Sequence, residues 1–308
     1  MDNSNLDKRS DEMPEKRVIS GGNYLSERPL FGEKHLIIED TTFDKGESPL
    51  KETEDITVKG GSFLWKYPLW YSKDIRVEGT YFGEGARAGI WYGENLEFTD
   101  CDIRAPKEFR RLKGLKLKDI SIPDAKETLW HCENVYLKNV SINGDYFGMN
   151  CKNVKADHLT VNGNYSFDGC ENVEIEDSRL ISKDCFWNCK NVVARNCEID
   201  GEYLAWNSEN ITLINCRIKS LQGLCYVNEL KVKDCFMEGS SLCFEYSSVT
   251  ADIKDSLISV INPLSGKISA KRIEKLILDP TKTDPDKTII EAEVDIRLSE
   301  FDGIIPEG

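Results

Sequence analysis

Apolar residues recur along this chain at a nearly constant interval. A short phrase returns six times: an acidic residue or lysine, then Asn, then an aliphatic residue. With the aliphatic residue as the anchor of each repeat, successive intervals are 20, 19, 21, 19, 20, 19, 19, 19, 19 and 19 residues. A period of this length is typical of solenoids, in which each repeat forms one coil. The anchors are Leu36, Ile56, Ile75, Leu96, Leu115, Val135, Val154, Val173, Val192, Ile211 and Leu230, with Ala251 as a twelfth after a two-residue insertion.

Within each repeat, apolar and polar residues alternate with a period of two. The positions two and seven after the anchor are apolar, and the position five before it is large and mostly aromatic. Residues two apart on a strand share a face, so all of these columns are predicted to point inward. No part of the repeat has helical periodicity over ten residues, and we expect three short strands in each coil. The aromatic column reads Trp70, Trp91, Trp130, Met149, Trp187, Trp206 and Tyr246.

These patterns predict an all-β fold, a single-stranded parallel β-helix of about twelve coils of 19–21 residues. Its hand should be right, as for other parallel crossover connections. A leucine-rich repeat shares the period but needs one strand, a helical or extended return and several fixed leucines, which are missing here. We expect residues 1–20 to be a disordered N-terminal segment, residues 21–258 to form the β-helix, and residues 259–308 to form a C-terminal cap of the same domain.

The eleven cysteines fit this repeat better than they fit a disulfide framework or a metal site. Their number is odd, and no Cys-x-x-Cys pair occurs. Eight of them occupy two columns, five residues after and three residues before the anchor. A small apolar side chain suits a narrow core, so these cysteines are predicted to be buried and unpaired. We expect no metal and no cofactor.

Polar columns mark the corners of the coil. Asn or Asp precedes most anchors directly, and a second Asn/Asp column follows four residues after them. Both residues favour turns, and stacked Asn amides can pair from coil to coil. The column two before the anchor alternates strictly in sign, which predicts a register-setting ladder of opposite charges. It reads Lys34, Glu54, Lys73, Glu94, Lys113, Glu133, Lys152, Glu171, Lys190 and Glu209.

The net charge limits the classes of partner. The chain has 54 acidic and 40 basic residues, a formal charge of −14. Nucleic acid and anionic membranes require cationic surfaces, so neither is expected as a partner. The start, Met1 to Arg17, lacks the apolar segment of a secretory signal, and no apolar run is long enough to span a bilayer. We therefore expect a cytoplasmic protein.

A candidate site follows from two outward columns, eight and four residues before the anchor. They combine tyrosines with charged residues and amides, which suits a groove for sugar rings. Glu127 and Asp184 lie three coils apart, roughly 14 Å, which exceeds the ~6.5–9.5 Å of an inverting carboxyl pair. Glu127 with His131 or Arg111 is the closer catalytic set. The predicted substrate-binding residues are Lys107, Tyr146, Tyr165, Asp184, Tyr203 and Asn150.

The twelve anchored coils, the Asn column at a corner and the stacked aromatic and aliphatic columns resemble the pectate-lyase-like right-handed β-helix superfamily. The Gly21–Tyr24 opening and the coils with Trp-x-Cys-Glu/Lys-Asn resemble, more narrowly, a bacterial family of β-helix proteins of unknown function. The resemblance covers residues 20–300 and implies the fold and a connection with carbohydrate. Arg217–Lys219 matches the Arg-Ile-Lys triplet of polygalacturonase-like enzymes, but their Asn-Thr-Asp, Asp-Asp and His-Gly motifs are missing at the corresponding positions.

Two functions remain open from the sequence. The first is a noncatalytic interaction scaffold that presents a long surface to a protein partner. The second is a carbohydrate-active enzyme, a glycoside hydrolase or lyase, or a glycan-binding protein that uses the outward aromatic and charged columns. The fold alone does not decide between them.

Overall fold

The computed structural model describes residues 15–237, 239–301 and 303. The strands are β1 (Arg17–Ser20), β2 (Asn23–Tyr24), β3 (Lys34–Glu39), β4 (Thr42–Phe43), β5 (Glu54–Lys59), β6 (Ser62–Phe63), β7 (Lys73–Glu78), β8 (Tyr81–Phe82), β9 (Glu94–Thr99), β10 (Asp102–Ile103), β11 (Lys113–Ile122) and β12 (Glu133–Asn143). They continue with β13 (Lys152–Asn162), β14 (Glu171–Glu176), β15 (Arg179–Ile181), β16 (Lys190–Arg195), β17 (Glu198–Asp200), β18 (Glu209–Ile214), β19 (Arg217–Lys219), β20 (Asn228–Cys235), β21 (Ser248–Ile253), β22 (Ser256–Ile261), β23 (Ser265–Ile277) and β24 (Thr288–Leu298). Two short 3-10 helices, η1 (Glu84–Ala86) and η2 (Pro285–Lys287), interrupt the loops.

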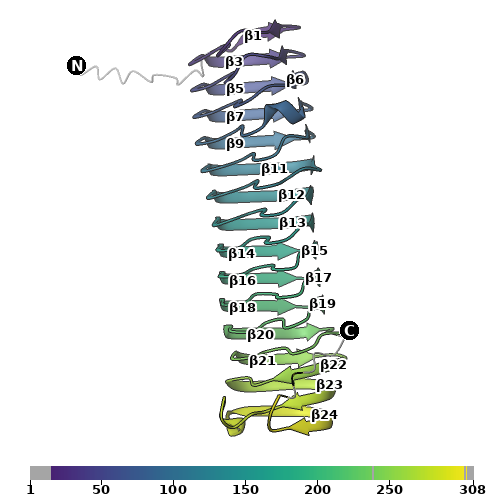
Figure 1. Ribbon diagram of the computed structural model, residues 1–308. Coiled ribbons are helices and arrows are strands. Elements are labelled where there is room, and N and C mark those ends of the chain that lie inside the picture. The colour runs from purple at the N-terminus through teal and green to yellow at the C-terminus, as the bar shows by residue number, and fades with distance from the viewer. Residues whose placement is uncertain (1–14, 238, 302, 304–308) are drawn as a thin grey trace, which may run out of the picture.

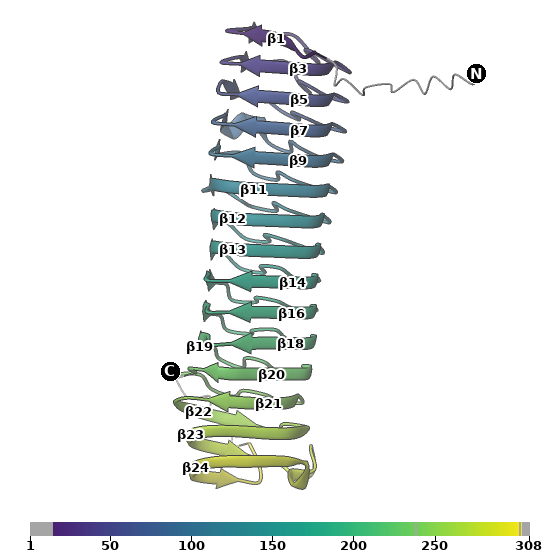
Figure 2. The same cartoon turned by 180° about the vertical axis from the view of Figure 1, so that it is seen from behind.

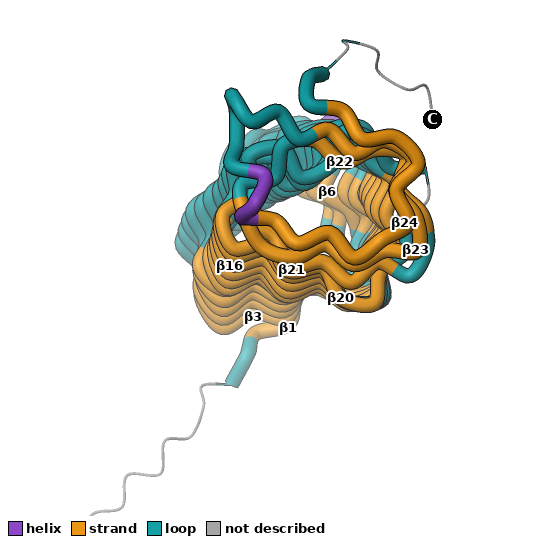
Figure 3. The backbone as a smooth tube through the Cα atoms, turned by 90° about the horizontal axis from the view of Figure 1, so that it is seen from below, coloured by secondary structure: helices purple, strands orange, loops and turns teal. Residues whose placement is uncertain are grey.

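The coils stack into one elongated column, with the N-terminal strands at one end and β24 at the other (Figures 1 and 2). Each strand pairs in parallel with its counterpart in the next coil, as β5 does with β7 and β12 with β13. Seen from the C-terminal end, the chain runs counterclockwise from β21 to β22 while the coils approach the viewer (Figure 3). This is the right-handed sense expected for parallel crossovers.

Each coil has two extended sides and one irregular side. In a typical coil the first side is a strand of six residues, such as β5, and the second is a strand of two or three, such as β6. The two strands merge into one in β11, β12 and β13. On both sides the predicted alternation holds, because Ile56 and Phe63 are 0% exposed and their neighbours face solvent.

The third side is not a strand, so the expectation of three strands per coil is wrong. Its backbone has positive φ at every second residue, as at Glu127 (52°), Leu129 (61°) and His131 (54°). Side chains alternate strictly only along an extended backbone. Here two successive residues point inward, since Thr128 and Leu129 are both 0% exposed.

The aromatic column of this side lies on the outer surface, and its predicted inward direction is wrong for the same reason. Trp70 and Trp91 are half-buried and stack with ring centroids 5.1 Å apart. Their indole N–H groups donate to the backbone oxygens of Ala88 and Lys107 at 2.7 and 2.8 Å. The indole N–H bonds to the backbone, and the ring covers the junction between two coils. Tryptophan suits this position because it does both. The same bond recurs at Trp130, Trp187 and Trp206.

The core between the three sides is a set of stacked columns. Tyr24, Phe43, Phe63 and Phe82 stack one above another, with ring centroids 4.8–5.3 Å apart. All eleven cysteines are buried and free, which confirms the structural interpretation of the cysteine columns. Burial raises the pKa of the Cys101 thiol to about 11, so it stays protonated and unreactive at neutral pH.

The Asn column before the anchor forms the first corner of each coil, as predicted. Asn153, Asn172 and Asn191 have φ of 55°, 58° and 58°, a left-handed conformation that few residues other than Gly and Asn adopt easily. Their side chains also form a ladder: Asn172 donates to Asn153 at 3.0 Å and Asn191 donates to Asn172 at 2.8 Å. Each Asn therefore fixes both the bend and the alignment of neighbouring coils.

Opposite charges pair along the exposed column next to this corner. Lys34 lies 2.5 Å from Glu54, and Lys152 lies 3.5 Å from Glu171. A further pair joins Lys190 to Glu209. Such exposed pairs stabilise by only ~0.2–1 kcal/mol each. Their strict alternation nevertheless disfavours a shift of one coil, which would place like charges together.

The column is longer than predicted, with about fifteen coils instead of twelve. β1 and β2 form a coil before Leu36, so the expectation of disorder up to residue 20 is wrong for Arg17–Ser20. The rest of that predicted disorder, residues 1–14, lies outside the described residues. At the other end β23 and β24 add coils within the segment predicted to be a cap.

The predicted anchor of the β21 coil, Ala251, is wrong. Leu230 pairs with Val249, so Val249 is the anchor, and Ala251 lies two positions later. There is no two-residue insertion before it. Instead the register shifts between Val232 and Cys235, because β21 has one residue fewer there.

The ladder predicts a graded response to substitution at Asn172. Asn172→Ala should lower the free energy of unfolding by about 1–2 kcal/mol. The substitution removes two side-chain hydrogen bonds, and it places alanine in a left-handed backbone conformation that alanine disfavours. Asn172→Gly removes the same bonds but tolerates the backbone, so its loss should be smaller. Urea denaturation measures both. Equal losses for Ala and Gly would contradict a conformational role for Asn.

Candidate functional site

The structure places eight of the nine predicted site residues on the outer surface of the irregular side. Lys107, Glu127, Tyr165 and Tyr203 are partly exposed there, and Arg111, His131, Tyr146 and Asn150 are exposed. Asp184 is the exception. It is only 3% exposed, so its predicted outward direction is wrong.

Glu127 is held by two cations that the proposed catalytic set does not include. Its carboxylate accepts from Arg110 Nη2 at 2.9 Å and from Lys107 Nζ at 3.1 Å. The hydrogen bond from Arg110, helped by Lys107, lowers the pKa of Glu127, which therefore stays ionised. A carboxylate in this state is a poor proton donor, and no hydrogen bond or ion pair in the described chain joins it to His131 or Arg111.

Arg110 is the central residue that the sequence analysis missed. Its guanidinium lies between two indole rings, 4.9 Å from the centroid of Trp91 and 4.3 Å from that of Trp130. Arg110 also donates to the backbone oxygen of Glu127 at 2.8 Å. The signal was available, because arginine interrupts the tryptophan column and stacks well on aromatic faces.

The remaining predicted residues have structural roles on this side. Tyr146 and Tyr165 stack in parallel, with centroids 4.8 Å apart. Asn150 has a positive φ of 53°, which explains the amide there. Partial burial, followed by the charges of Arg111 and Arg110, lowers the pKa of His131. The lowered pKa of His131 favours its neutral form.

One buried carboxyl group lies inside the coil next to this side. Glu108 is 0% exposed. Its Oε1 accepts the Gly89 N–H at 3.1 Å, and its Oε2 has no partner among the described residues. Gly89 leaves the space that this side chain fills, because a Cβ there would lie 2.6 Å from Oε2. Burial raises the pKa of Glu108 well above its usual value, so it favours the neutral acid.

Asp184 is a second carboxyl with an unpartnered oxygen, Oδ2. Burial raises its pKa, and the neighbouring carboxylates of Glu202 and Asp168 add to the effect. The residue before it, Lys183, pairs instead with Glu202 at 2.9 Å. A neutral Asp184 satisfies its surroundings better than a charged one.

A groove runs along the first corner, away from the predicted face. It has a volume of about 790 Å³ and runs across six coils, from Asp55 on β5 to Lys155 on β13. Its floor is strand backbone at the anchors, whose side chains point inward. Its two edges are the Asn/Asp column before the anchor and the residue after the anchor. We call this the first-corner groove.

Both signs of charge line the first-corner groove. The column after the anchor alternates there between cationic and other side chains, and the opposite edge is acidic at its start and amide beyond, except at Gly114. Sequence reasoning did not find this groove because its floor is backbone, which no residue type marks. The charged residues along it are Lys16, Asp55, Asp74, Arg76, Glu97, Lys116 and Lys155.

A second groove, of about 510 Å³, borders the predicted face. This second groove is lined by residues that directly precede the column of Glu127 and Tyr146, such as Lys126 and Asp145. Gly144 and Gly163 form part of its floor, and a Cβ at Gly163 would lie 2.1 Å from the backbone of the preceding coil. The glycines are therefore required by coil stacking.

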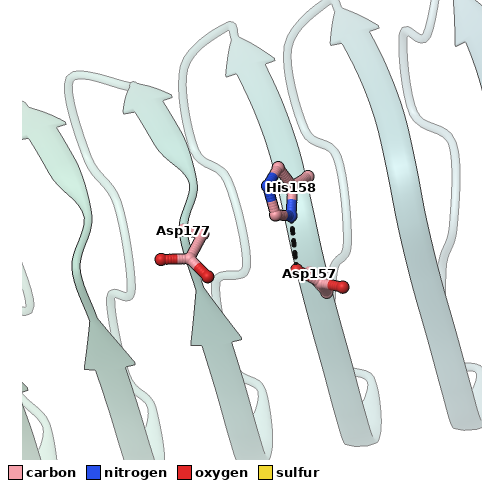
Figure 4. A group of neighbouring side chains, drawn as sticks. All are labelled: Asp157, His158 and Asp177. Carbon is pink, nitrogen blue, oxygen red and sulfur yellow. Dashed lines mark hydrogen bonds and ion pairs between the residues drawn. The ribbon is translucent and has the colours of Figure 1, made fainter.

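Three potential metal ligands meet at the second corner (Figure 4). Ligand atoms of Asp157, His158 and Asp177 lie within 4.8 Å of one another. Asp157 accepts from His158 at 2.5 Å and pairs with Lys138 at 3.6 Å. The hydrogen bond with His158 lowers the pKa of Asp157. The group is exposed, and surface ion pairing accounts for its geometry.

The family profile of DUF3737, a protein of unknown function, matches residues 17–291. The chain therefore belongs to the DUF3737 family. Comparison with curated proteins gives no match. The match begins at the first residue of β1, so the family's shared region and the stacked coils largely coincide.

Among solved structures, the chain is similar to PfbA, a surface adhesin of Streptococcus pneumoniae, with 10% identity and a TM-score of 0.39 over 87% of this chain and 84% of that chain. It is also similar to the A-module of the mannuronan C-5 epimerase AlgE4 of Azotobacter vinelandii, with 9% identity and a TM-score of 0.29 over 93% and 87%. At these scores neither likeness bears on function. In the described part of the chain, no helix has the length and apolar character needed to cross a membrane.

The buried acid predicts a pH-dependent gain for Glu108→Gln. In the unfolded chain, the carboxyl group of Glu108 loses its proton at about pH 4.3. In the native protein it keeps the proton above that pH, because burial raises its pKa. Wild-type stability should therefore fall as pH rises through this window, by up to about 1.4 kcal/mol per pH unit. The variant lacks this loss, so urea denaturation at pH 5, 6 and 7 should show a growing advantage for it. A pH-independent difference would refute a protonated Glu108.

The ion pairs of Glu127 predict a structural phenotype. Glu127→Gln should lower the free energy of unfolding at pH 7 by about 0.5–1 kcal/mol, a modest loss because the pairs are partly exposed. The wild-type advantage should disappear as pH falls through the lowered pKa of Glu127. His131→Asn, which suits the left-handed backbone, should not destabilise. Thermal melts at pH 7 and 3 test this, and the idea fails if Glu127→Gln melts like wild type at both.

Proposed function

We propose that this protein is a noncatalytic scaffold that binds an extended polypeptide segment of a partner in the first-corner groove. The observation that carries the proposal is the groove itself, about 790 Å³ across six coils with charged side chains of both signs along its edges. A linear ligand along the column axis would meet a new coil every ~4.8 Å. Regular spacing of this kind suits an extended chain better than a compact molecule.

The charges favour a polypeptide over a neutral glycan. Arg76, Glu97 and Lys116 succeed one another after the anchors of three adjacent coils. Alternating charge attracts a segment with the complementary order and repels one with like charges opposed, which gives specificity. A neutral polysaccharide would gain nothing from this alternation.

The absence of an assembled proton-transfer set supports a noncatalytic role. The ionised carboxylate of Glu127 is paired with Arg110 and Lys107, and no hydrogen bond or ion pair among the described residues joins it to His131 or Arg111. Of the acids with raised pKa, Glu108 and Asp184 are buried, whereas Glu245 is half-buried. A general acid must reach its substrate, and neither of the two buried acids does so in this structure.

Affinity purification from the native cell, with the full chain as bait, tests the proposal. A specific partner should bind wild type and should be lost, by at least about tenfold, with the double variant Arg76→Glu and Lys116→Glu. Lys231→Glu is the matched control, because Lys231 lies on the same column beyond the groove. A partner that binds all three proteins equally would refute the groove. Turnover in a hydrolase and lyase panel, together with no groove-dependent partner, would refute the scaffold.

The alternative, glycan binding, rests on a different surface. Tyr71 and Tyr92 stack with centroids 4.8 Å apart and are 44% and 40% exposed. Exposed parallel rings are suitable platforms for sugars. Binding on a glycan array that Tyr71→Ala abolishes would favour this function over the scaffold.

A further inference from the structure

Planar side chains with an N–H edge recur at the position five before the anchor, on the irregular side. Each tryptophan of this column donates its indole N–H to the backbone oxygen of the residue eight before the next anchor. Arg110 holds the same position in its own coil and makes the same bond, to the backbone oxygen of Glu127 at 2.8 Å. A guanidinium therefore replaces an indole in this column without loss of the bond. The tryptophans are Trp70, Trp91, Trp130, Trp187 and Trp206.

Two successive coils interrupt this column. Met149 and Asp168 hold the position five before the anchor between Trp130 and Trp187. Neither a thioether nor a carboxylate has an N–H group to donate, and neither has a ring. We call the space beside Asp168, between Met149 and Trp187, the column gap.

The side chain of Asp168 turns away from the direction that the rings take. Its Oδ1 accepts the Asn188 Nδ2 at 2.9 Å, and Asn188 stands four before the next anchor. The rings of the column reach instead toward the residue eight before the next anchor, which is Asp184 at this coil. The backbone oxygen of Asp184 therefore borders the column gap, and Asp168 leaves open the space that an indole fills in other coils.

The column gap has the width of one planar cation. Met149 and Trp187 lie two coils apart, which is two steps of ~4.8 Å, or about 9.6 Å. Trp91 and Trp130 are also two coils apart, and the guanidinium of Arg110 lies between them, 4.9 Å and 4.3 Å from their ring centroids. The chain thus shows that a guanidinium fits between side chains at this separation.

The column gap also has an excess of negative charge. Asp184 is 3% exposed, and its Oδ2 has no partner among the described residues. Burial raises the pKa of Asp184, the charge of Lys183 opposes this rise, and the carboxylates of Glu202 and Asp168 add to it. The amine of Lys183 pairs with Glu202 at 2.9 Å. A cation in the gap would therefore lie beside two carboxylates, Asp168 and Asp184, that Lys183 does not pair with.

We propose that the column gap binds a guanidinium cation from outside this chain, carried by an arginine residue of a polypeptide or by free arginine. Its plane stacks on the indole of Trp187, with Met149 at its other face. Its N–H groups donate to the backbone oxygen of Asp184 and to the carboxylate of Asp168. The gap lies on the irregular side, away from the first-corner groove, so this proposal and the proposed function can fail separately.

Titration of the full chain with acetyl-arginine amide, followed by NMR of ¹⁵N-labelled tryptophan, tests the binding. The indole N–H signal of Trp187, assigned with Trp187→Phe, should shift and saturate. Trp65 is the control for unspecific stacking, because it is 37% exposed and lies outside the column. Acetyl-lysine amide should bind at least about fivefold more weakly, since an ammonium has no flat face. A Trp187 shift no larger than that of Trp65, or equal binding of the two amides, would overturn the proposal.

Free arginine, as a further probe, distinguishes the two sources of the guanidinium. Acetyl-arginine amide has the charge of an arginine residue within a polypeptide, whereas free arginine adds an ammonium and a carboxylate. Tighter binding of the amide assigns the gap to a polypeptide, and tighter binding of the amino acid assigns it to a small molecule. Either result supports a guanidinium site, and binding of neither probe contradicts it.

A matched pair of variants separates local contact from overall charge. Asp168→Asn keeps an oxygen for Asn188 but loses the charge, and it should weaken binding at least about threefold. Glu174→Gln removes one charge from the extended side of the same coil and should leave binding unchanged. An equal loss in both variants would show that the probe responds to net charge and not to the column gap.

An arginine placed in the column by mutation should occupy the gap from within. Asp168→Arg should abolish the shift of Trp187 by acetyl-arginine amide, because its own guanidinium stacks there as that of Arg110 does between its indoles. Its melting temperature should exceed that of Asp168→Lys, which has the same charge without the flat face. If Asp168→Arg is folded and still binds the probe as wild type does, the guanidinium site is not the column gap.

Discussion

The structure depends on keeping about fifteen short coils in register while each one closes at sharp corners. Left-handed backbone at the corners makes the bends possible, and Asn is the side chain that tolerates this conformation and also bonds its copy on the next coil. The column before the anchor therefore sets both the bend and the alignment. The inward cysteines, the phenylalanine stack and the charge ladder are in register because this corner repeats.

This constraint also limits where function can reside. A stacked coil uses its outward side chains to bond the coils above and below, and most of the polar surface is engaged in this way. Glu127 with Arg110 and Lys107 is an example, since an apparent catalytic acid joins neighbouring coils instead. The first-corner groove has a floor of strand backbone, although its edges are also joined from coil to coil, as by Asn153 with Asn134 and Lys116 with Glu97. Membership of the DUF3737 family adds no activity, so the functional argument rests on this surface.

The two extended sides were predictable because period-two patterning applies to extended backbone, and Ile56 and Phe63 face inward as expected. The third side was not, because its alternating positive φ turns two successive residues inward and moves Trp70 outward. Gly and Asn recur among its residues and were the available signal. Eight of the nine predicted site residues share the irregular side, but patterning did not reveal that Arg110 binds Glu127 or that Asp184 is buried. No pattern of residue types indicates the first-corner groove, because its floor is backbone.

The central claim is that the corner amides from Asn134 to Asn210 form a continuous hydrogen-bonded ladder that sets the register. Hydrogen exchange of Asn side-chain NH₂ groups, followed by NMR on selectively Asn-labelled protein, tests it most directly. The account predicts slow exchange at Asn153, Asn172, Asn191 and Asn210, whose amides donate along the ladder. Exchange of all four at the rate of a free amide would contradict it.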